Sequence, residues 1–254
     1  MFKKIYYINL DHRLDRKNNV ELQLKKINCN CPVERINAAY GKNLDLKNIP
    51  KNLFTEYAKE STKNKSDIDN TQTMTKGGMG VAMSQKWIYE KVLVGEEDYV
   101  LILEDDIEIP DNFMEKLKNS LSKIPEYDIL WLGYHTKINV DMYKDYDVPY
   151  KIWGLFGYII NKKAAKHLLE LFPLNKQIDS EIPRAFDSLK VYALKRDKKL
   201  IFSDLSQDSF NKFGTDIQFS REAFGNISLK NNTIIIISII IILLGFVLYK
   251  RNYK

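Results

Sequence analysis

The sequence predicts an α/β fold, in which a mixed and mostly parallel sheet is flanked by helices, together with one C-terminal transmembrane helix. Short apolar or β-branched runs alternate along the chain with segments of helical periodicity, which is the pattern of an α/β layer. The run 99–103, "YVLIL", is apolar on both faces, as central parallel strands tend to be. A long uncharged stretch near the C-terminus indicates the membrane helix.

The N-terminal part predicts a strand, a helix and a second strand. "KIYYINL" at 4–10 is aromatic and β-branched, and 11–28 carries apolar residues between charges with helical character. "VERINAAYG" at 33–41 indicates a short strand that ends in a turn. The segment 42–76 is polar, and within it only "NLFTEYAKE" indicates a short helix.

The following part repeats this alternation. The glycines of "GGMG" open a helix over 77–94, the strand 99–103 follows, and a helix is expected over 112–121. "YDILWLG" at 127–133 indicates a buried strand, and a strand through Ile160 leads into a helix from Lys162. Two last short strands are expected within 189–204, so we place one domain over 1–220.

Composition and charge are those of an ordinary folded protein. Hydrophobic residues make up 44% and charged residues 28% of the chain, which excludes a disordered chain. The net charge is +6, but the lysines are scattered among Asn and Ile, so we expect no nucleic-acid partner. Cys29 and Cys31 are one residue apart, a spacing poorly suited to a disulfide.

The stretch "IIIISIIIILLGFVLY" at 234–249 has no charge and precedes a basic tail, 250–254. We expect a transmembrane helix over 233–249 after a linker over 221–232, and a very hydrophobic buried helix or strand is the alternative. The basic tail favours a cytoplasmic tail and therefore a domain on the other side of the membrane. The absence of a signal-peptide pattern favours a domain in the cytoplasm. We expect a single-pass membrane protein whose domain lies in the cytoplasm.

Three consecutive acids, Glu104, Asp105 and Asp106, follow the strand 99–103. If the extended geometry continues, Glu104 and Asp106 point one way and Asp105 the other. Neighbouring carboxylates raise each other's pKa unless a cation shares them, and such oxygen ligands suit Mg²⁺ or Mn²⁺. The alternative is a solvated turn that caps the next helix.

Five segments occur in order along 3–218: "YYINLDHRLDRK", "GGMGVAMSQKWIY", "YVLILEDDIEI", "DILWLG" and "WGLFGYIINKKAAKHLL". Together they resemble glycosyltransferase family 25, the lipooligosaccharide and collagen galactosyltransferase family. The resemblance implies a GT-A fold that binds a UDP-sugar through Mn²⁺ or Mg²⁺. It also implies transfer of galactose or glucose, with inversion, to a glycan or hydroxylysine acceptor.

The resemblance also assigns roles to particular residues. Asp106 becomes the metal ligand, with Glu104 as a second ligand or a ribose partner. In the closing segment "SQDSFNKFGTDIQ", Asp208 completes the metal or donor site, with Ser209 and Asp216 as alternatives. The family has Cys and His where this chain has Val81 and Gln85, which puts its catalytic rate in doubt. The expected donor-binding residues are Asn9, Asp11, Asp15, Arg16, Gly80, Ser84, Gln85, Glu104 and Asp105.

The base that inversion requires is expected to be Asp179, with Glu181 as the alternative, while a helix cap is an equal reading of Asp179. His135 could contact the metal or acceptor or be a plain loop histidine. Trp131, Trp153 and Tyr158 could stack on sugars or belong to the core. Two other functions stay open: a catalytically inactive sugar-binding or scaffold protein at a membrane, and a metal-dependent phosphoryl-transfer enzyme.

Overall fold

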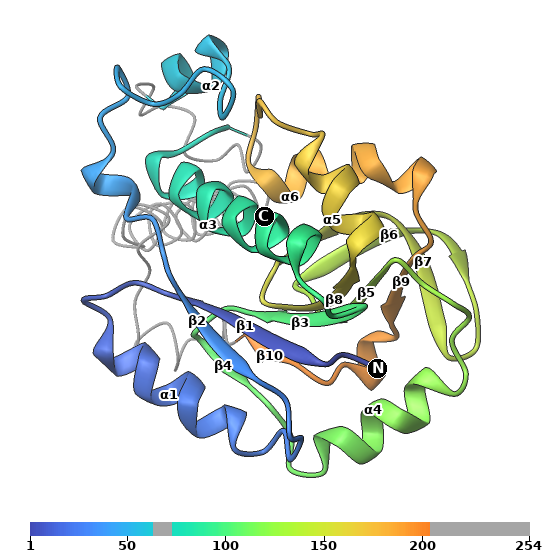
Figure 1. Cartoon of the computed structure of the whole chain (residues 1–254). Coiled ribbons are helices and arrows are strands. Elements are labelled where there is room, and N and C mark those ends of the chain that lie inside the picture. Colours follow the sequence, from blue (N-terminus) through green and yellow to red (C-terminus); the bar gives the residue numbers. More distant parts are fainter. Residues whose placement is uncertain (63–72, 204–254) are drawn as a thin grey trace, which may run out of the picture. The chain divides into compact units, whose positions relative to one another are not determined.

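The structure is a computed structural model of the chain, and it describes residues 1–62 and 73–203. These residues fall within the first of two units of the chain, Met1–Phe213. The predicted α/β class is confirmed, because helices pack on both faces of an eight-stranded mixed sheet (Figure 1). The expected domain end at residue 220 lies outside the described residues and stays a prediction.

The large sheet has the strand order β2-β1-β3-β8-β5-β9-β7-β6. Its strands are β1 (Lys4–Asn9), β2 (Val33–Asn37), β3 (Tyr99–Leu103), β5 (Ile129–Gly133), β6 (Thr136–Met142), β7 (Tyr146–Trp153), β8 (Gly157–Asn161) and β9 (Val191–Leu194). Two short strands, β4 (Ile107–Glu108) and β10 (Phe202–Ser203), form a separate antiparallel pair. Parallel pairs join β1 to β2 and β3, and β5 to β9, whereas β8 runs antiparallel to both β3 and β5.

The register between β1 and β3 positions the acidic strand end. Tyr7 lies opposite Leu103, and the two strands are parallel. Their carboxyl ends therefore lie at the same edge of the sheet, which is where ligands collect in open α/β sheets. Asn9 and the acids after Leu103 are brought together by this pairing.

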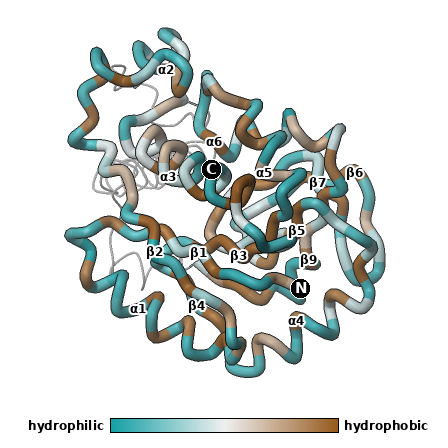
Figure 2. Tube along the Cα trace, viewed as in Figure 1, coloured by the Kyte–Doolittle hydropathy of each residue, from teal (hydrophilic) through white to brown (hydrophobic). Residues whose placement is uncertain are grey.

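Two hydrophobic cores lie on opposite faces of the sheet. On β3, Val100 and Ile102 belong to the core that includes α3 and α5, whereas Leu101 and Leu103 belong to the core that includes α1 and α4. This alternation follows from the pleat of a strand, whose successive side chains point to opposite faces. Figure 2 shows the hydrophobic colour running along β3 and its neighbours in the centre of the fold.

A helix lies in each segment that was predicted to be helical, and the short helix at 178–181 was not predicted. The α-helices are α1 (Leu14–Leu24), α2 (Glu56–Ser61), α3 (Lys76–Val94), α4 (Phe113–Leu121), α5 (Lys162–Leu169) and α6 (Ile178–Glu181). The 3₁₀ turns are η1 (Gly41–Asn43), η3 (Ile182–Ser188) and η4 (Arg196–Lys198). Thr75 caps α3 by accepting a hydrogen bond from the Gly78 amide, and Asn161 caps α5 in the same way through Ala164.

The β6–β7 hairpin is the largest element that the sequence patterns did not predict. Ile138, Val140 and Met142 alternate with polar residues, which is the pattern of a strand, but all three side chains are exposed. They lie on β6, which among the described residues pairs with β7 alone and so forms the edge of the sheet there. The alternation could have revealed the strand β6, although not the fact that its apolar residues face outward.

The expectation that Cys29 and Cys31 do not form a disulfide is wrong. The structure joins their sulfurs, and the two Cα atoms are 5.3 Å apart. That separation lies within the range that a disulfide spans. The turn between α1 and β2 therefore brings the two residues close enough, which their spacing in the sequence does not show.

The structure also corrects the expected membrane localisation. Within 1–62 and 73–203 no helix combines the length and the apolar character needed to cross a bilayer. The longest of these helices, α3, has 19 residues but carries charges such as Lys86, Glu90 and Lys91 along its length. The stretch 233–249, where the anchor was expected, lies outside the described residues. A membrane anchor is therefore not supported.

Candidate active site

The centre of the candidate site is Asp105, which joins the end of β3 to the N-terminal segment. Its Oδ2 accepts a hydrogen bond of 2.7 Å from Asn9 Nδ2, and its Oδ1 accepts one of 3.1 Å from Arg16 Nη1. Asp105 is only 6% exposed, and burial raises the pKa of its carboxyl group although Arg16 and Asn9 oppose the shift. The expectation that Asp105 faces away is wrong, because β3 ends at Leu103 and the alternation of faces does not continue.

Asp106 is less buried and remains available to a ligand. Its Oδ2 is 3.4 Å from Arg16 Nη1, and its Oδ1 accepts a hydrogen bond of 3.4 Å from Ser203 Oγ. Ser203 lies on β10, which pairs with β4 just after the acids. No local pattern of residues indicates this contact, because the pairing of β4 with β10 brings Ser203 to the site.

Glu104 shows that the site holds an excess of negative charge. Burial, and then repulsion from Asp106 and Asp105, raise the pKa of its carboxyl group well above its usual range, while Arg16 opposes the shift. Asp179 adds to the repulsion, so its carboxylate belongs to the same electrostatic neighbourhood. Keeping these carboxylates ionised so close together costs free energy unless a bound cation neutralises part of their charge.

A divalent metal fits this arrangement only if a bound molecule or water supplies the rest of its coordination shell. Within the part of the chain that the structure describes, no group of three or more His, Cys, Asp and Glu could hold a metal ion. Asp208, the expected third ligand, lies outside the described residues. Asp106 and Glu104 still provide two carboxylates, and Mg²⁺ commonly takes one or two carboxylates and completes its shell with phosphate oxygens and water.

The other acids of the N-terminal segment pair with bases instead of facing the strand end. Asp11 accepts hydrogen bonds of 2.8 Å from Arg35 and 2.6 Å from Asn37, and these contacts lower the pKa of its carboxyl group. Arg13 holds Asp15 through contacts of 2.8 and 3.0 Å, which lower the pKa of Asp15 to about 2. Arg35 also donates to Asn9 Oδ1 at 2.9 Å, and so it orients the asparagine that binds Asp105.

Gly80 and Ser84 pack α3 against the loop after β2. A Cβ atom on Gly80 would lie 2.3 Å from the carbonyl oxygen of Ala39, so only glycine allows this approach. Ser84 Oγ accepts a hydrogen bond of 2.9 Å from the Ala39 amide and donates to the Gly80 carbonyl at 2.7 Å. Both residues are buried, and their described contacts are structural.

Gln85 lies inside the protein in a small polar network. Its Oε1 accepts a hydrogen bond of 2.7 Å from the Tyr158 hydroxyl, which lies 3.0 Å from the Tyr89 hydroxyl. Its Nε2 is buried and has no hydrogen-bond partner among the described residues. Glu104 contributes to raising the pKa of Tyr158, so the network lies close to the acidic strand end.

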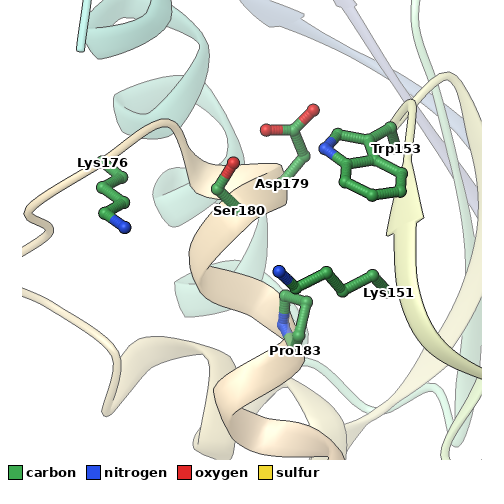
Figure 3. A pocket seen from close by; sticks show the side chains of 6 residues that line it. All are labelled: Lys151, Trp153, Lys176, Asp179, Ser180 and Pro183. Atoms are coloured by element: carbon green, nitrogen blue, oxygen red, sulfur yellow. The ribbon is translucent and has the colours of Figure 1, made fainter. Parts of the chain in front are cut away.

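Asp179 lines a pocket between β7 and the segment α6–η3 (Figure 3). The other lining residues are Lys151, Trp153, Lys176, Ser180 and Pro183. Burial raises the pKa of Asp179 to about 6, and its Oδ1 is buried without a hydrogen-bond partner among the described residues. Figure 3 shows the carboxyl group directed toward the Trp153 ring.

Glu181, the alternative base, is occupied by its own loop. Its Oε1 accepts hydrogen bonds from the amides of Asn175 at 3.2 Å and Lys176 at 3.0 Å. Its Oε2 accepts one of 2.7 Å from Arg184. These contacts leave Asp179 as the better placed of the two carboxylates to receive a proton.

Three candidates remain: His135 lies near the acids, Trp153 lines the Asp179 pocket, and Trp131 lies in the core. His135 lies near the acids: burial lowers the pKa of its imidazole, and Asp106 opposes the shift. Trp153 lines the Asp179 pocket, whereas Trp131 is fully buried and stacks on Tyr158 with ring centroids 5.6 Å apart. Trp131 therefore belongs to the core.

Comparison with known proteins identifies relatives of this chain. Residues 2–182 match the family model described as Glycosyltransferase family 25 (LPS biosynthesis protein). Procollagen galactosyltransferase 1-B of Xenopus laevis is 26% identical and covers 73% of this chain and 31% of its own length. Probable inactive glycosyltransferase 25 family member 3 of Rattus norvegicus is 25% identical, with a coverage of 73% and 33%. The chain thus spans about a third of the length of these curated relatives.

Among solved structures, a Drosophila beta-1,4-galactosyltransferase 7 mutant in complex with manganese, UDP-Gal and xylobiose is similar to this chain. The two are 11% identical, the TM-score is 0.37, and the similarity covers 88% of this chain and 79% of that one.

Proposed function

This chain belongs to glycosyltransferase family 25, and we propose that it transfers galactose or glucose from a UDP-sugar to a glycan or hydroxylysine hydroxyl, with inversion. The observation that carries the proposal is the acidic end of β3. There Asp105 is bound by Asn9 and Arg16, while Asp106 and Glu104 remain as a pair of carboxylates with excess negative charge. Such a pair suits a cation and the diphosphate that comes with it.

The residues at the end of β3 would hold the metal. Asp106 and Glu104 are its proposed ligands, and a bound Mn²⁺ or Mg²⁺ would neutralise the charge that develops on the diphosphate leaving group. Arg16 contacts both Asp105 and Asp106, so it orients Asp106 and limits the repulsion between the acids. Asn9 and Arg35 complete this support from β1 and β2.

Asp179 is the proposed base. Inverting transfer requires a group that accepts the proton of the attacking hydroxyl, and a carboxylate does this better when its pKa approaches the working pH. With a pKa of about 6, Asp179 is mostly ionised at pH 7 yet more basic than an ordinary aspartate. Its buried Oδ1 has no described hydrogen-bond partner and could receive that proton. Glu181 is a positioning residue, since it holds the amides that precede α6.

A sugar-binding protein without catalytic activity is the second candidate, because Gln85 stands where the family has a histidine. Glutamine hydrogen-bonds but does not take up a proton at neutral pH. In this chain Gln85 is fully buried and bound to Tyr158, so its described contact is with the core. Turnover of a UDP-sugar distinguishes this candidate from an active enzyme.

The proposal is tested by the release of UDP from UDP-galactose and UDP-glucose in the presence of Mn²⁺. We expect turnover by the wild-type chain and a loss of more than about 100-fold in Asp106→Ala, because a metal ligand is removed. Asp111→Ala is the matched control, since its carboxylate is 96% exposed and lies on the loop before α4. Binding of UDP without turnover would favour the inactive alternative, and no binding of either nucleotide sugar would refute the proposal.

A further inference from the structure

The pocket beside Asp179 carries more positive than negative charge. Two lysines, Lys151 from β7 and Lys176 from the loop before α6, line it together with the single carboxylate of Asp179. The remaining lining residues, Trp153, Ser180 and Pro183, carry no charge. A ligand with a negative group would therefore be attracted to this pocket, provided that the group lies nearer to the lysines than to Asp179.

We propose that this pocket binds a sugar acceptor that carries an acidic group, a carboxylate or a phosphate ester, close to the hydroxyl that is glycosylated. The inference rests on the proposed function in naming the ligand an acceptor, while the binding of an acidic sugar is a property of the pocket itself. The acidic group would contact Lys151 and Lys176, and the hydroxyl would face Asp179.

Lys151 has no acidic partner among the described residues, in contrast to three lysines of neighbouring segments. Lys137 and Lys195 both bind Asp147, and Lys198 binds Asp145 at 2.7 Å. No carboxylate of the described residues lies within ion-pair distance of the Lys151 ammonium group. Its charge is therefore not offset locally, and an anionic ligand would meet an ammonium group that is not already neutralised.

The walls of the pocket are held in place before any ligand binds. Glu181 accepts the amide of Lys176 at 3.0 Å, and Gln177 Nε2 donates to the Thr73 carbonyl at 3.0 Å, so the loop before α6 is fixed at both positions. On the opposite wall, the carbonyl of Trp153 accepts a hydrogen bond of 2.8 Å from the His135 amide. A preformed wall reduces the ordering that a ligand would otherwise have to impose.

Trp153 indicates that the ligand is a sugar and not a bare anion. Its ring faces the pocket beside Asp179 (Figure 3), and it is partly exposed. An aromatic ring offers a flat apolar surface against which the C–H face of a sugar can pack, while its hydroxyls reach polar groups around it. The pocket thus combines a stacking surface, a carboxylate and two ammonium groups.

The two lysines could instead bind the diphosphate of the donor, and this alternative predicts a different result. If the lysines bind the acceptor, removing the charge of Lys151 should weaken the binding of acidic sugars and leave UDP binding unchanged. A donor role makes the same change weaken UDP binding in the presence of Mn²⁺. The two roles are therefore separated by measuring both ligands on one variant.

The experiment follows the indole signals of the full-length chain by NMR during titration with three sugars: methyl glucoside, methyl glucuronide and methyl glucoside 6-phosphate. The chain has three tryptophans, and Trp153→Phe identifies the signal from the pocket. We expect at least one of the acidic sugars to shift the Trp153 signal and to bind about three- to tenfold more tightly than the neutral sugar. The tighter of the two acidic sugars identifies the carboxylate or the phosphate as the preferred group.

Lys151→Gln should remove this preference and leave the affinity for methyl glucoside unchanged, because glutamine keeps most of the side chain and loses the charge. Lys116→Gln, on the exposed face of α4, is the matched control and should change nothing. Equal binding of all three sugars, equal behaviour of the two variants, or a weaker affinity for UDP in Lys151→Gln would each overturn the inference. If the chain binds no UDP at all, the proposed function fails, and the sugar titration still decides whether the pocket is selective for acidic sugars.

Discussion

Neighbouring residues of one acidic run carry different roles because their surroundings differ. Asp105 is buried and holds Asn9 and Arg16, whereas Asp106 is partly exposed and its described contacts are two of 3.4 Å. Glu104 precedes both of them, and burial and repulsion from the two aspartates disfavour its charge. A substitution at each position should therefore affect a different property of the protein.

Asp105→Ala should destabilise the protein. The change leaves Asn9 Nδ2 and Arg16 Nη1 without the buried carboxylate that accepts their hydrogen bonds at 2.7 and 3.1 Å. Losing two hydrogen bonds to a buried carboxylate costs about 1–3 kcal/mol, which urea denaturation would detect as a lower midpoint. Asp111→Ala, which changes a fully exposed acid, should leave the midpoint unchanged, and equal midpoints for all three proteins would contradict the structural role of Asp105.

Asp179→Asn should lower turnover and change its pH dependence. A base with a pKa of about 6 must be ionised, so wild-type turnover should rise with pH up to about 6 and then level off. The asparagine variant should lose this dependence together with about 100-fold or more of the turnover number. Asp187→Asn, at an exposed acid of η3, should keep both the rate and the pH profile.

The same substitution should stabilise the protein at high pH. The folded-state pKa of Asp179, about 6, lies above its ordinary value of 3.8, so the folded protein binds more protons than the unfolded chain between these values. The free energy of unfolding of the wild type therefore falls as the pH rises from 4 to 6. Asp179→Asn should be the more stable protein at pH 8 and gain nothing at pH 3, as thermal unfolding would show. A wild type that is the more stable at pH 8 would contradict the raised pKa.

At the scale of elements, the packing of α3 against the loop after β2 depends on the absence of side chains. Cβ atoms on Gly80 and on Gly41 would lie 2.3 Å from the Ala39 carbonyl and 2.1 Å from the Lys76 carbonyl. The clashing atoms belong to the backbone, which cannot change rotamer to make room as a side chain can. The helix α3 begins at Lys76, with Thr75 as its cap. The contact between Gly41 and the Lys76 carbonyl therefore lies at the first residue of this helix.

Gly80→Ala should therefore push α3 away from the loop. Overpacking of this kind costs about 1–3 kcal/mol, which outweighs the gain in helix propensity of about 1 kcal/mol. Gly78→Ala tests the same helix without the clash, because its Cβ would be 3.2 Å from the Thr75 hydroxyl and 3.5 Å from Gln177. We expect the melting temperature to fall in Gly80→Ala and to change little in Gly78→Ala. An equal melting temperature for the two variants would contradict the close approach.

At the scale of the whole molecule, the site is assembled from segments far apart in the sequence. Asn9 and Asp105 are separated by 96 residues, and they meet because β1 and β3 are parallel neighbours. Ser203 reaches Asp106 through the pairing of β10 with β4, and Asp179 influences Glu104 from the segment after α5. None of these contacts follows from the local pattern of residues around either partner.

Local patterns did predict most of the elements. The strand 99–103 and the helix that begins at Lys162 were predicted correctly, because apolar runs and helical periodicity reflect the burial of each segment. The hairpin β6–β7 was missed, although the apolar residues of β6 alternate with polar ones as in a strand; these β6 residues face solvent. The orientation of Asp105 was predicted wrongly, because alternation of faces holds only while the strand lasts.

The sequence by itself determined the α/β class, the order of most strands and helices, and the family motifs, since each depends on residues close together in the chain. Only the tertiary structure decided which acid is bound by Asn9 and Arg16, and which lysines lie beside Asp179. It also decided that Asp179 has a buried oxygen with no hydrogen-bond partner among the described residues. Burial, hydrogen bonding and nearby charge set the chemistry of a carboxylate, and all three depend on which distant segments fold around it.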